Sequence, residues 1–183
     1  MIEKPDEAEV IEKAIEWVVT RMKGLRRKSG DRPMVTHSLR VGFTLDRAGE
    51  SVKVVAAGIL HDLTEDASVT SNEIELEFGK EIRLLVDACS HDNRLHEEDR
   101  KKSNLDLFKR AIAHGRDAII IKVADASDNI QGIQYLKEDR QTEFIERAKL
   151  WKTAGEQFCG PQHSLVAQLS RRIERASAIV LEV

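Results

Sequence analysis

Imidazole and carboxylate side chains that could hold a divalent metal ion occur at three places along this 183-residue chain. The set comprises His37, His61, Asp62 and Asp125. Nitrogen and oxygen ligands of this kind suit Mn, Fe, Zn or a related divalent ion better than a thiolate site would. A cation of this type favours phosphoryl transfer, because it neutralises the phosphate and lowers the pKa of its bound water.

The pair His61-Asp62 stands at the end of an almost wholly apolar stretch, residues 51–63, which predicts a buried helix. Neighbouring residues on a helix point about 100° apart, so both can face one ion only near a helix end. Glu65-Asp66 follow four residues later, on the same sides if the helix continues. The dipeptide alone is a weak motif, since His91-Asp92 repeats it in a polar stretch. Its position beside other site-type residues gives it weight.

Helical periodicity runs through most of the chain, and few Pro or Gly residues interrupt it. We expect helices at about 8–23, 36–48, 51–63, 70–78, 82–88, 105–113, 117–134, 140–158 and 162–181. The apolar run 118–121 could be a strand by itself, but the pattern continues past strand length and favours a helix. A bundle places metal ligands on facing helices, and His37 and Asp125 fall on different ones.

Three segments resemble the motifs of one family. Residues 59–66, Ile-Leu-His-Asp-Leu-Thr-Glu-Asp, resemble the HD…ED motif of the RelA/SpoT-type alarmone hydrolases. Residues 27–33, Arg-Lys-Ser-Gly-Asp-Arg-Pro, followed by His37, resemble that family's RKxGxP…H segment. Residues 122–129, Lys-Val-Ala-Asp-Ala-Ser-Asp-Asn, resemble its KxADxxxN segment. The resemblance covers about residues 21–133, in the family's order, and the length is similar to that of the small stand-alone hydrolases.

The resemblance implies an all-α fold, a single-domain helical bundle of the HD-domain type over residues 1–183. Its motif core covers about 21–133, and C-terminal helices cover about 138–183. The implied ligands of one Mn²⁺ are His37, His61, Asp62 and Asp125. The implied catalytic acids, which orient and activate the attacking water, are Glu65 and Asp66. The implied contacts to the nucleotide or its phosphates are Arg27, Lys28 and Asn129.

The implied reaction removes the 3′-pyrophosphate from guanosine tetra- or pentaphosphate alarmones, giving GDP and pyrophosphate from the tetraphosphate. Met34 and Gln131 stand where the family usually has Tyr and Arg, which motivates an alternative substrate such as ATP, GTP, a deoxynucleotide or NADPH. An alternative of another class is a nucleotide-binding sensor with little turnover. The intact Glu65-Asp66 pair argues against the sensor, because binding alone does not need it.

Composition narrows the partners and the location. The net charge of −3 provides no basic field for nucleic acid. No apolar run approaches the roughly 20 residues that span a membrane, and residues 1–7 lack the apolar core of a signal peptide. Cys89 and Cys159 form no CxxC pair, which disfavours a thiolate zinc site. We therefore expect a cytoplasmic protein with a small nucleotide substrate. We expect its other histidines at the surface: His91, His96, His114 and His163.

Overall fold

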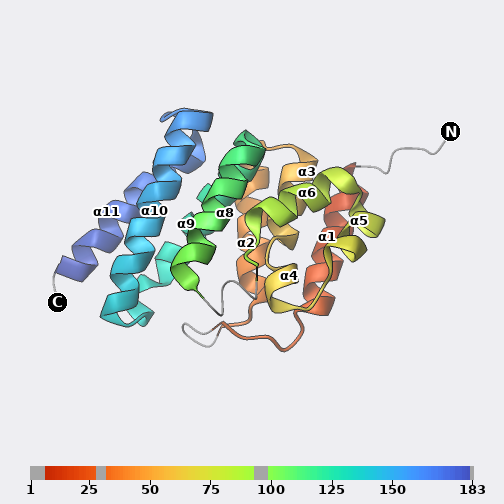
Figure 1. Cartoon of the computed structure of the whole chain (residues 1–183), viewed down its shortest axis with the longest axis horizontal. Helices are drawn as coiled ribbons and strands as arrows, with labels where there is room; N and C mark the ends of the chain where they lie inside the picture. The colour runs from red at the N-terminus through yellow and green to blue at the C-terminus, as the bar shows by residue number, and fades with distance from the viewer. Residues whose placement is uncertain (1–6, 28–31, 93–98, 182–183) are drawn as a thin grey trace.

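The computed structural model describes residues 7–27, 32–92 and 99–181 (Figure 1). Helices dominate these residues, and the only β-type pairing within them is an isolated antiparallel bridge between Arg26 and Pro33. This confirms the predicted all-α fold class. Whether the whole chain is one domain stays a prediction.

The helices follow the predicted order, but the expected helix 51–63 ends at Leu60 and a separate short helix begins at Leu63. Their bounds are α1 Glu7–Arg21, α2 Val35–Arg47, α3 Val52–Leu60, α4 Leu63–Asp66, α5 Ser71–Phe78, α6 Lys80–Cys89, α8 Arg100–His114, α9 Arg116–Asn129, the 3₁₀ helix η1 Ile130–Tyr135, α10 Glu138–Cys159 and α11 Ser164–Leu181. The expected helix 117–134 is thus split, because its last turn and a half tightens into η1. The polar stretch before residue 105 already contributes the first turn of α8.

Two short helices, α3 and α9, form the buried centre of the bundle. In α3 every residue from Val54 to Leu60 is buried, and in α9 every residue from Ala118 to Asp128 is buried. Helix α2 packs against both of them, α1 and α6 cover α3, and α10 and α11 cover the other side of α9 (Figure 1). A helix as apolar as residues 54–60 of α3 belongs in such a position, whereas α9 also carries the charged side chains of Lys122, Asp125 and Asp128 into the interior. The run 118–121 is therefore helix, as its continuing pattern predicted.

Glycines let α2 and α3 approach each other closely. A Cβ atom on Gly42 would lie 2.2 Å from Cγ1 of Ile59, and one on Gly58 would lie 2.3 Å from Cδ1 of Leu45. Such distances are far inside van der Waals contact, so each glycine makes room for a side chain of the other helix. The close crossing brings the start of α2 and the end of α3, with His37 and His61, to the same place.

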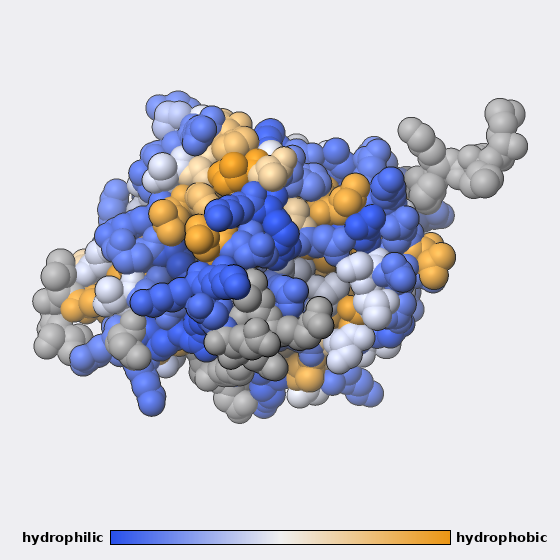
Figure 2. All heavy atoms as spheres, viewed as in Figure 1, coloured by the Kyte–Doolittle hydropathy of each residue, from blue (hydrophilic) through white to orange (hydrophobic). Residues whose placement is uncertain are grey.

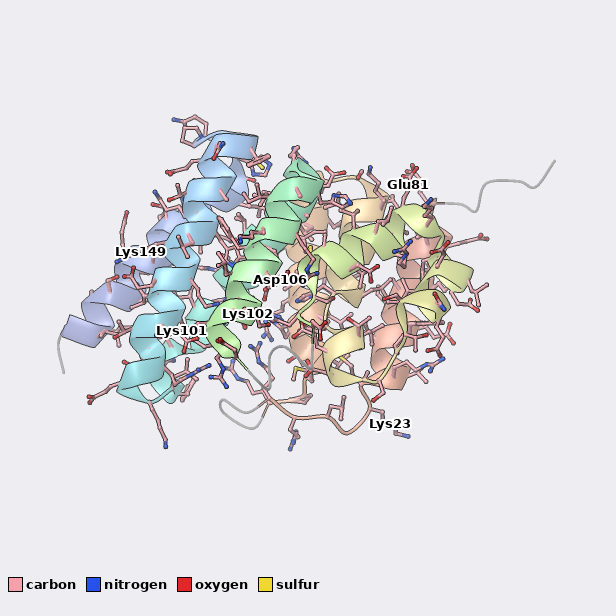
Figure 3. All side chains as sticks on the ribbon, in the orientation of Figure 1. Lys23, Glu81, Lys101, Lys102, Asp106 and Lys149 are labelled. Carbon is pink, nitrogen blue, oxygen red and sulfur yellow. The ribbon has the colours of Figure 1, made fainter. Side chains whose placement is uncertain are left out.

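An apolar strip lies between α8 and α10 on an otherwise largely polar face (Figure 2). Leu105 is 53% exposed and Leu150 is 56% exposed there. Lys101 and Lys102 lie in the first turn of α8, and Lys149 lies on α10 (Figure 3). Among the described residues, no helix combines the length and the apolar character needed to cross a membrane.

Candidate metal centre

Three helices bring the four predicted ligands into one cluster. His37 comes from α2, His61 and Asp62 follow α3, and Asp125 comes from α9. Nε2 of His37 lies 3.1 Å from Oδ1 of Asp125 and 3.4 Å from Oδ2 of Asp62. Nε2 of His61 lies 3.0 Å from Oδ1 of Asp62 and 3.8 Å from Oδ1 of Asp125. The structure therefore brings together all four residues that the sequence singled out.

Each histidine is held by its other ring nitrogen. Nδ1 of His61 lies 2.8 Å from the carbonyl oxygen of Gly58, which can only accept, so the Nδ1–H donates. Nδ1 of His37 lies 2.7 Å from Oδ2 of Asp128 and donates to that carboxylate. A proton on Nδ1 of the neutral ring leaves the Nε2 lone pair free toward the cluster. Metal-binding histidines are oriented in this way by carbonyl and carboxylate partners.

The pKa shifts of the buried histidines and carboxylates indicate that the cluster favours a bound cation. Burial alone would lower the pKa of His61, but the neighbouring charge of Asp62 outweighs it and holds that pKa well above its usual range. Burial would raise the pKa of Asp125, yet the charge of Lys122 and the hydrogen bond from His37 hold it well below its usual range. The carboxylates thus remain ionised and draw positive charge onto the imidazoles. A bound cation would satisfy the same demand.

The donor set passes a direct test of fit to a metal ion. Nε2 of His61 is fully buried and has no hydrogen-bond partner of good geometry among the described residues. An unpaired buried nitrogen costs free energy. His37, His61 and Asp62 each offer a ligand atom, and the three atoms lie within 4.8 Å of one another. A buried, orphaned imidazole nitrogen facing carboxylates is a suitable ligand for a divalent ion.

Lys122 shares Asp125 with the cluster. Its Nζ lies 2.5 Å from Oδ2 of Asp125 and 3.2 Å from the carbonyl oxygen of Cys89, and the lysine is buried. Burial would lower the pKa of Lys122, but the charge of Asp125 outweighs burial and raises it. Asp125 therefore pairs with Lys122 through one oxygen while its other oxygen faces the two histidines.

Glu65 and Asp66, the two predicted catalytic acids, differ in their surroundings. Glu65 is half-buried, and its Oε1 accepts a 2.6 Å hydrogen bond from the backbone N–H of His91. Burial and the charge of Asp62 raise the pKa of Glu65 to about 7, although Lys122 opposes the shift. A carboxyl group with a pKa near neutrality is suited to general acid–base work. Asp66 is exposed, and its catalytic role stays a prediction.

Two of the three predicted phosphate contacts lie together next to the cluster. A guanidinium nitrogen of Arg27 donates to Oδ1 of Asn129, and Nδ2 of Asn129 donates to Oδ1 of Asp125. Arg27 is also 3.6 Å from Asp128. The third, Lys28, lies outside the described residues. Their roles in substrate binding stay predictions.

The sequence reasoning did not single out Asp128 and Arg40, which support His37. Nε and NH2 of Arg40 donate to Oδ1 and Oδ2 of Asp128 at 2.6 and 2.9 Å, a bidentate pair. Each lies three residues after a predicted ligand, Asp128 after Asp125 and Arg40 after His37. Residues three apart share a helix face, so this spacing could have pointed to both of them.

Among the histidines expected at the surface, His91 and His163 are only partly exposed. His91 is half-buried, its Nδ1 lies 2.9 Å from Oγ of Ser103, and its backbone N–H reaches Glu65. His163 is half-buried because its Nε2 lies 3.1 Å from the buried carboxylate of Glu50. His114 is exposed as expected, and His96 lies outside the described residues.

Replacing Asp128 with asparagine is expected to weaken divalent-metal binding at the candidate site by about 10–100-fold, the usual effect of losing a partner that orients a ligand. The amide lacks the charge that holds His37 Nδ1–H and the Arg40 fork. Titration calorimetry of metal-stripped protein measures the affinity. Asp117→Asn makes the same change at the other end of α9, where Asp117 pairs with Lys53 at 3.1 Å, and should leave the affinity unchanged. Equal affinities in both variants would contradict the role of Asp128.

Curated relatives match part of the chain. It is 33% identical over 138 residues to the guanosine-3′,5′-bis(diphosphate) 3′-pyrophosphohydrolase of Borreliella burgdorferi, covering 74% of this chain and 20% of that protein. It is 32% identical over 133 residues to the GTP pyrophosphokinase of Streptomyces antibioticus, covering 72% and 16%. The chain thus spans a fifth or less of the length of these two relatives.

A solved structure is similar over nearly its whole length. The structure described as "A metazoan ortholog of SpoT hydrolyzes ppGpp and plays a role in starvation responses" superposes with a TM-score of 0.78. It is 22% identical in sequence, and the match covers 94% of this chain and 97% of that one. At this identity the likeness establishes the fold.

A family model described as the HD domain matches residues 14–151, which include all four residues of the cluster. The match spans three quarters of the chain, and its helices are the ones that hold the histidines and carboxylates in place. The chain belongs to the HD domain family.

Proposed function

We propose that the chain is a metal-dependent pyrophosphohydrolase that removes the 3′-diphosphate of guanosine tetra- and pentaphosphate. The observation that carries this proposal is the convergence of His37 and His61, through their Nε2 atoms, on the carboxylates of Asp62 and Asp125, beside Glu65. The curated relatives' names and the family motifs support the choice of substrate.

The proposed ligands are His37, His61, Asp62 and Asp125, and the proposed ion is Mn²⁺. When bound, such an ion neutralises phosphate charge and lowers the pKa of a bound water. The chain's own residues supply the rest. Glu65 accepts the proton of the attacking water, and Asp66 is the proposed second acid. General acid–base help of this kind is typically worth about 10²–10⁴-fold in rate.

The proposed hydrolysis forms one bond to phosphorus and breaks one. Water adds to the phosphorus atom that carries the 3′-oxygen, and the bond between this phosphorus and the 3′-oxygen breaks. The leaving oxygen takes up a proton, so the products from the tetraphosphate are GDP and pyrophosphate. Arg27 and Asn129, which lie at the edge of the cluster, are the proposed contacts to the phosphates. Lys28 is proposed with them on the motif alone.

A shallow hollow of about 10 Å³ adjoins the proposed metal site. It is lined by Asp125, Asn129, Phe144, Arg147 and Trp151, among others, so it begins at the proposed metal site. Arg147 and Trp151 also line the apolar strip between α8 and α10. Aromatic and guanidinium planes stack well on bases. Of the lining residues, Phe144 and Arg147 are partly exposed and are the ones placed to contact a base, whereas Trp151 is buried and packs against Phe108.

The substrate is tested with metal-stripped protein supplied with Mn²⁺ and offered guanosine tetraphosphate, guanosine pentaphosphate, ATP, GTP and NADPH. We expect pyrophosphate and GDP or GTP from the two alarmones alone. Turnover of ATP or NADPH without alarmone turnover would replace this proposal by an HD phosphohydrolase for another nucleotide. Tight binding with no turnover would favour a sensor.

The two free cysteines fit the cytoplasmic location proposed from composition.

A further inference from the structure

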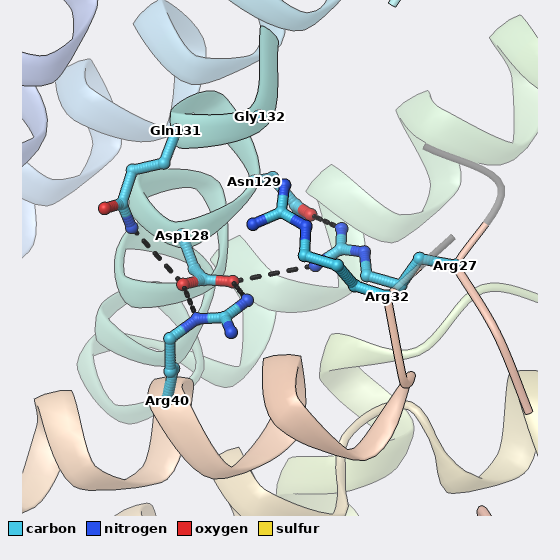
Figure 4. Close-up of a pocket in the computed structure, with 7 residues that line it drawn as sticks. All are labelled: Arg27, Arg32, Arg40, Asp128, Asn129, Gln131 and Gly132. Carbon is cyan, nitrogen blue, oxygen red and sulfur yellow. Dashed lines mark hydrogen bonds and ion pairs between the residues drawn. The ribbon is translucent and has the colours of Figure 1, made fainter. Parts of the chain in front are cut away.

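A polar pocket of about 180 Å³ lies beside the candidate metal centre (Figure 4). Its lining consists of three arginines, one carboxylate, two amides and a glycine: Arg27, Arg32, Arg40, Asp128, Asn129, Gln131 and Gly132. Figure 4 shows the side chains of Arg27 and Arg32 extending toward Asn129, with Arg40 reaching Asp128 from the other side. All the side chains of this lining are polar or charged, and Gly132 contributes only backbone.

Positive charge in this pocket exceeds negative charge. The single carboxylate of the lining, Asp128, already accepts the bidentate pair from Arg40 and the hydrogen bond from His37. Arg27 lies farther from it, at 3.6 Å, and donates to the neutral amide of Asn129. Three guanidinium groups against one carboxylate leave two positive charges to be balanced. A pocket of this kind attracts an anion.

The guanidinium of Arg32 lies against two residues of η1, Gly132 and Tyr135. Its guanidinium carbon lies 5.6 Å from the ring centre of Tyr135, in a cation–π arrangement. A Cβ atom on Gly132 would lie 3.1 Å from NH2 of Arg32, so glycine leaves the space that the guanidinium approaches. The start of η1 thus accommodates an arginine that comes from the loop before α2.

The pocket shares residues with the metal centre. Asp128 lines the pocket and holds His37, while Asn129 lines it and donates to Asp125. A group bound in the pocket would therefore lie next to the residues that hold His37 and Asp125. Since the pocket is separated from the cluster by these side chains, the bound group would be a different part of the same molecule.

We propose that the arginine pocket, Arg27, Arg32 and Arg40 with Asp128, binds a second phosphate or diphosphate of the substrate, one that is not hydrolysed. This proposal rests on the proposed function, since it assigns a second contact to the same substrate. Guanidinium groups match phosphate oxygens with paired hydrogen bonds. The lining offers charges and hydrogen-bonding groups rather than an apolar surface for a nucleobase. The enzyme would therefore prefer nucleotides that carry phosphates at both the 5′- and the 3′-position.

Arg32→Gln tests the proposal with little risk to the fold or to metal binding. Arg32 is exposed, lies in a loop, and takes no part in the Asp128–His37 contact. Arg47→Gln is the matched control, because it removes the same charge from an exposed arginine in the last turn of α2. Inorganic pyrophosphate is titrated calorimetrically into each metal-free protein at fixed salt. We expect about 10-fold weaker binding for Arg32→Gln, as for the loss of one charge-assisted hydrogen bond, and no change for the control.

Steady-state kinetics then test whether the anion bound in the pocket is the 5′-diphosphate of the substrate. Guanosine 5′-diphosphate 3′-diphosphate is compared with guanosine 3′-diphosphate, which lacks the 5′-phosphates. Wild type is expected to prefer the first through KM, and Arg32→Gln should lose about 10-fold of that preference. An equal loss for both substrates, or for neither, would overturn the proposal in favour of a base contact or of no contact. If neither substrate is hydrolysed, the proposed function fails, while the pyrophosphate titration still decides whether the pocket binds anions.

Discussion

Asp62→Ala is expected to abolish stoichiometric Mn²⁺ binding and to lower turnover by about 10³-fold or more. Asp62 faces both imidazoles, with its oxygens 3.0 Å from Nε2 of His61 and 3.4 Å from Nε2 of His37. Its loss removes a charged ligand from a site with few donors. Stabilisation of phosphate charge by a metal is worth several kcal/mol, and about 4 kcal/mol corresponds to 10³-fold in rate. Elemental analysis after dialysis against Mn²⁺ measures the retained metal.

The matched control for this variant is Asp46→Ala, which removes an exposed carboxylate from α2. It should keep one Mn²⁺ per chain and full turnover, and circular dichroism should show the same helical content in both variants. An Asp62→Ala protein that is folded and still retains one ion per chain would place the metal elsewhere. This outcome is distinct from misfolding, which the spectrum reveals.

The four residues of the candidate metal cluster could be singled out from the sequence because their need for partners follows from burial. His61-Asp62 come at the end of a helix whose residues from Val54 to Leu60 are all buried. Two polar side chains in that position must face something that satisfies them. Asp125 lies in a helix that is buried on every side, and the same argument applies. The convergence of these side chains follows once α2, α3 and α9 pack together.

The contacts that orient the cluster could not be predicted in the same way. His61 is fixed by the carbonyl of Gly58, a backbone group that carries no sequence signal. Glu65 is fixed by the backbone N–H of His91, which is far away in the sequence. The close crossing of α2 and α3 depends on Gly42, whose role shows only when a Cβ atom is placed beside Ile59. Side-chain types predict which groups need partners, whereas the three-dimensional packing decides which partners they find.

Arg32 illustrates another limit. In the sequence it stands between Asp31 and Pro33 in the segment 27–33 that resembles the family motif, and nothing there marks it as part of a pocket. Its place in a pocket depends on Tyr135 and Gly132, about a hundred residues further along the chain. The replacement of the family's usual arginine by Gln131 was visible in the sequence, but the arginines that line the same pocket from another segment were not recognisable as a group.

Glu65→Gln is expected to leave Mn²⁺ binding intact and to lower turnover by about 10²–10⁴-fold, the usual contribution of a general acid or base. Glutamine keeps the oxygen that accepts from His91 N–H but cannot take a proton from water. Glu81→Gln is the matched control, since the Glu81 side chain is 82% exposed on α6 (Figure 3). Turnover under saturating Mn²⁺ and the metal content of each variant separate the catalytic role from a ligand role. A loss of metal together with activity would make Glu65 a ligand instead.

The pH dependence of stability provides an independent test of Glu65 in the metal-free protein. Its pKa of about 7 in the folded state, compared with 4.5 for an ordinary glutamate, means that the folded state binds this proton more tightly. The contribution of Glu65 to the free energy of unfolding therefore falls as pH rises from about 4.5 to about 7. In Glu65→Gln this component is absent, so the variant should gain about 1–3 kcal/mol relative to wild type across that window. Urea unfolding of both proteins at pH 5 and pH 8 measures the difference. A constant difference would mean that Glu65 ionises normally, and its proposed role as the base would then need another way to hold a proton near neutrality.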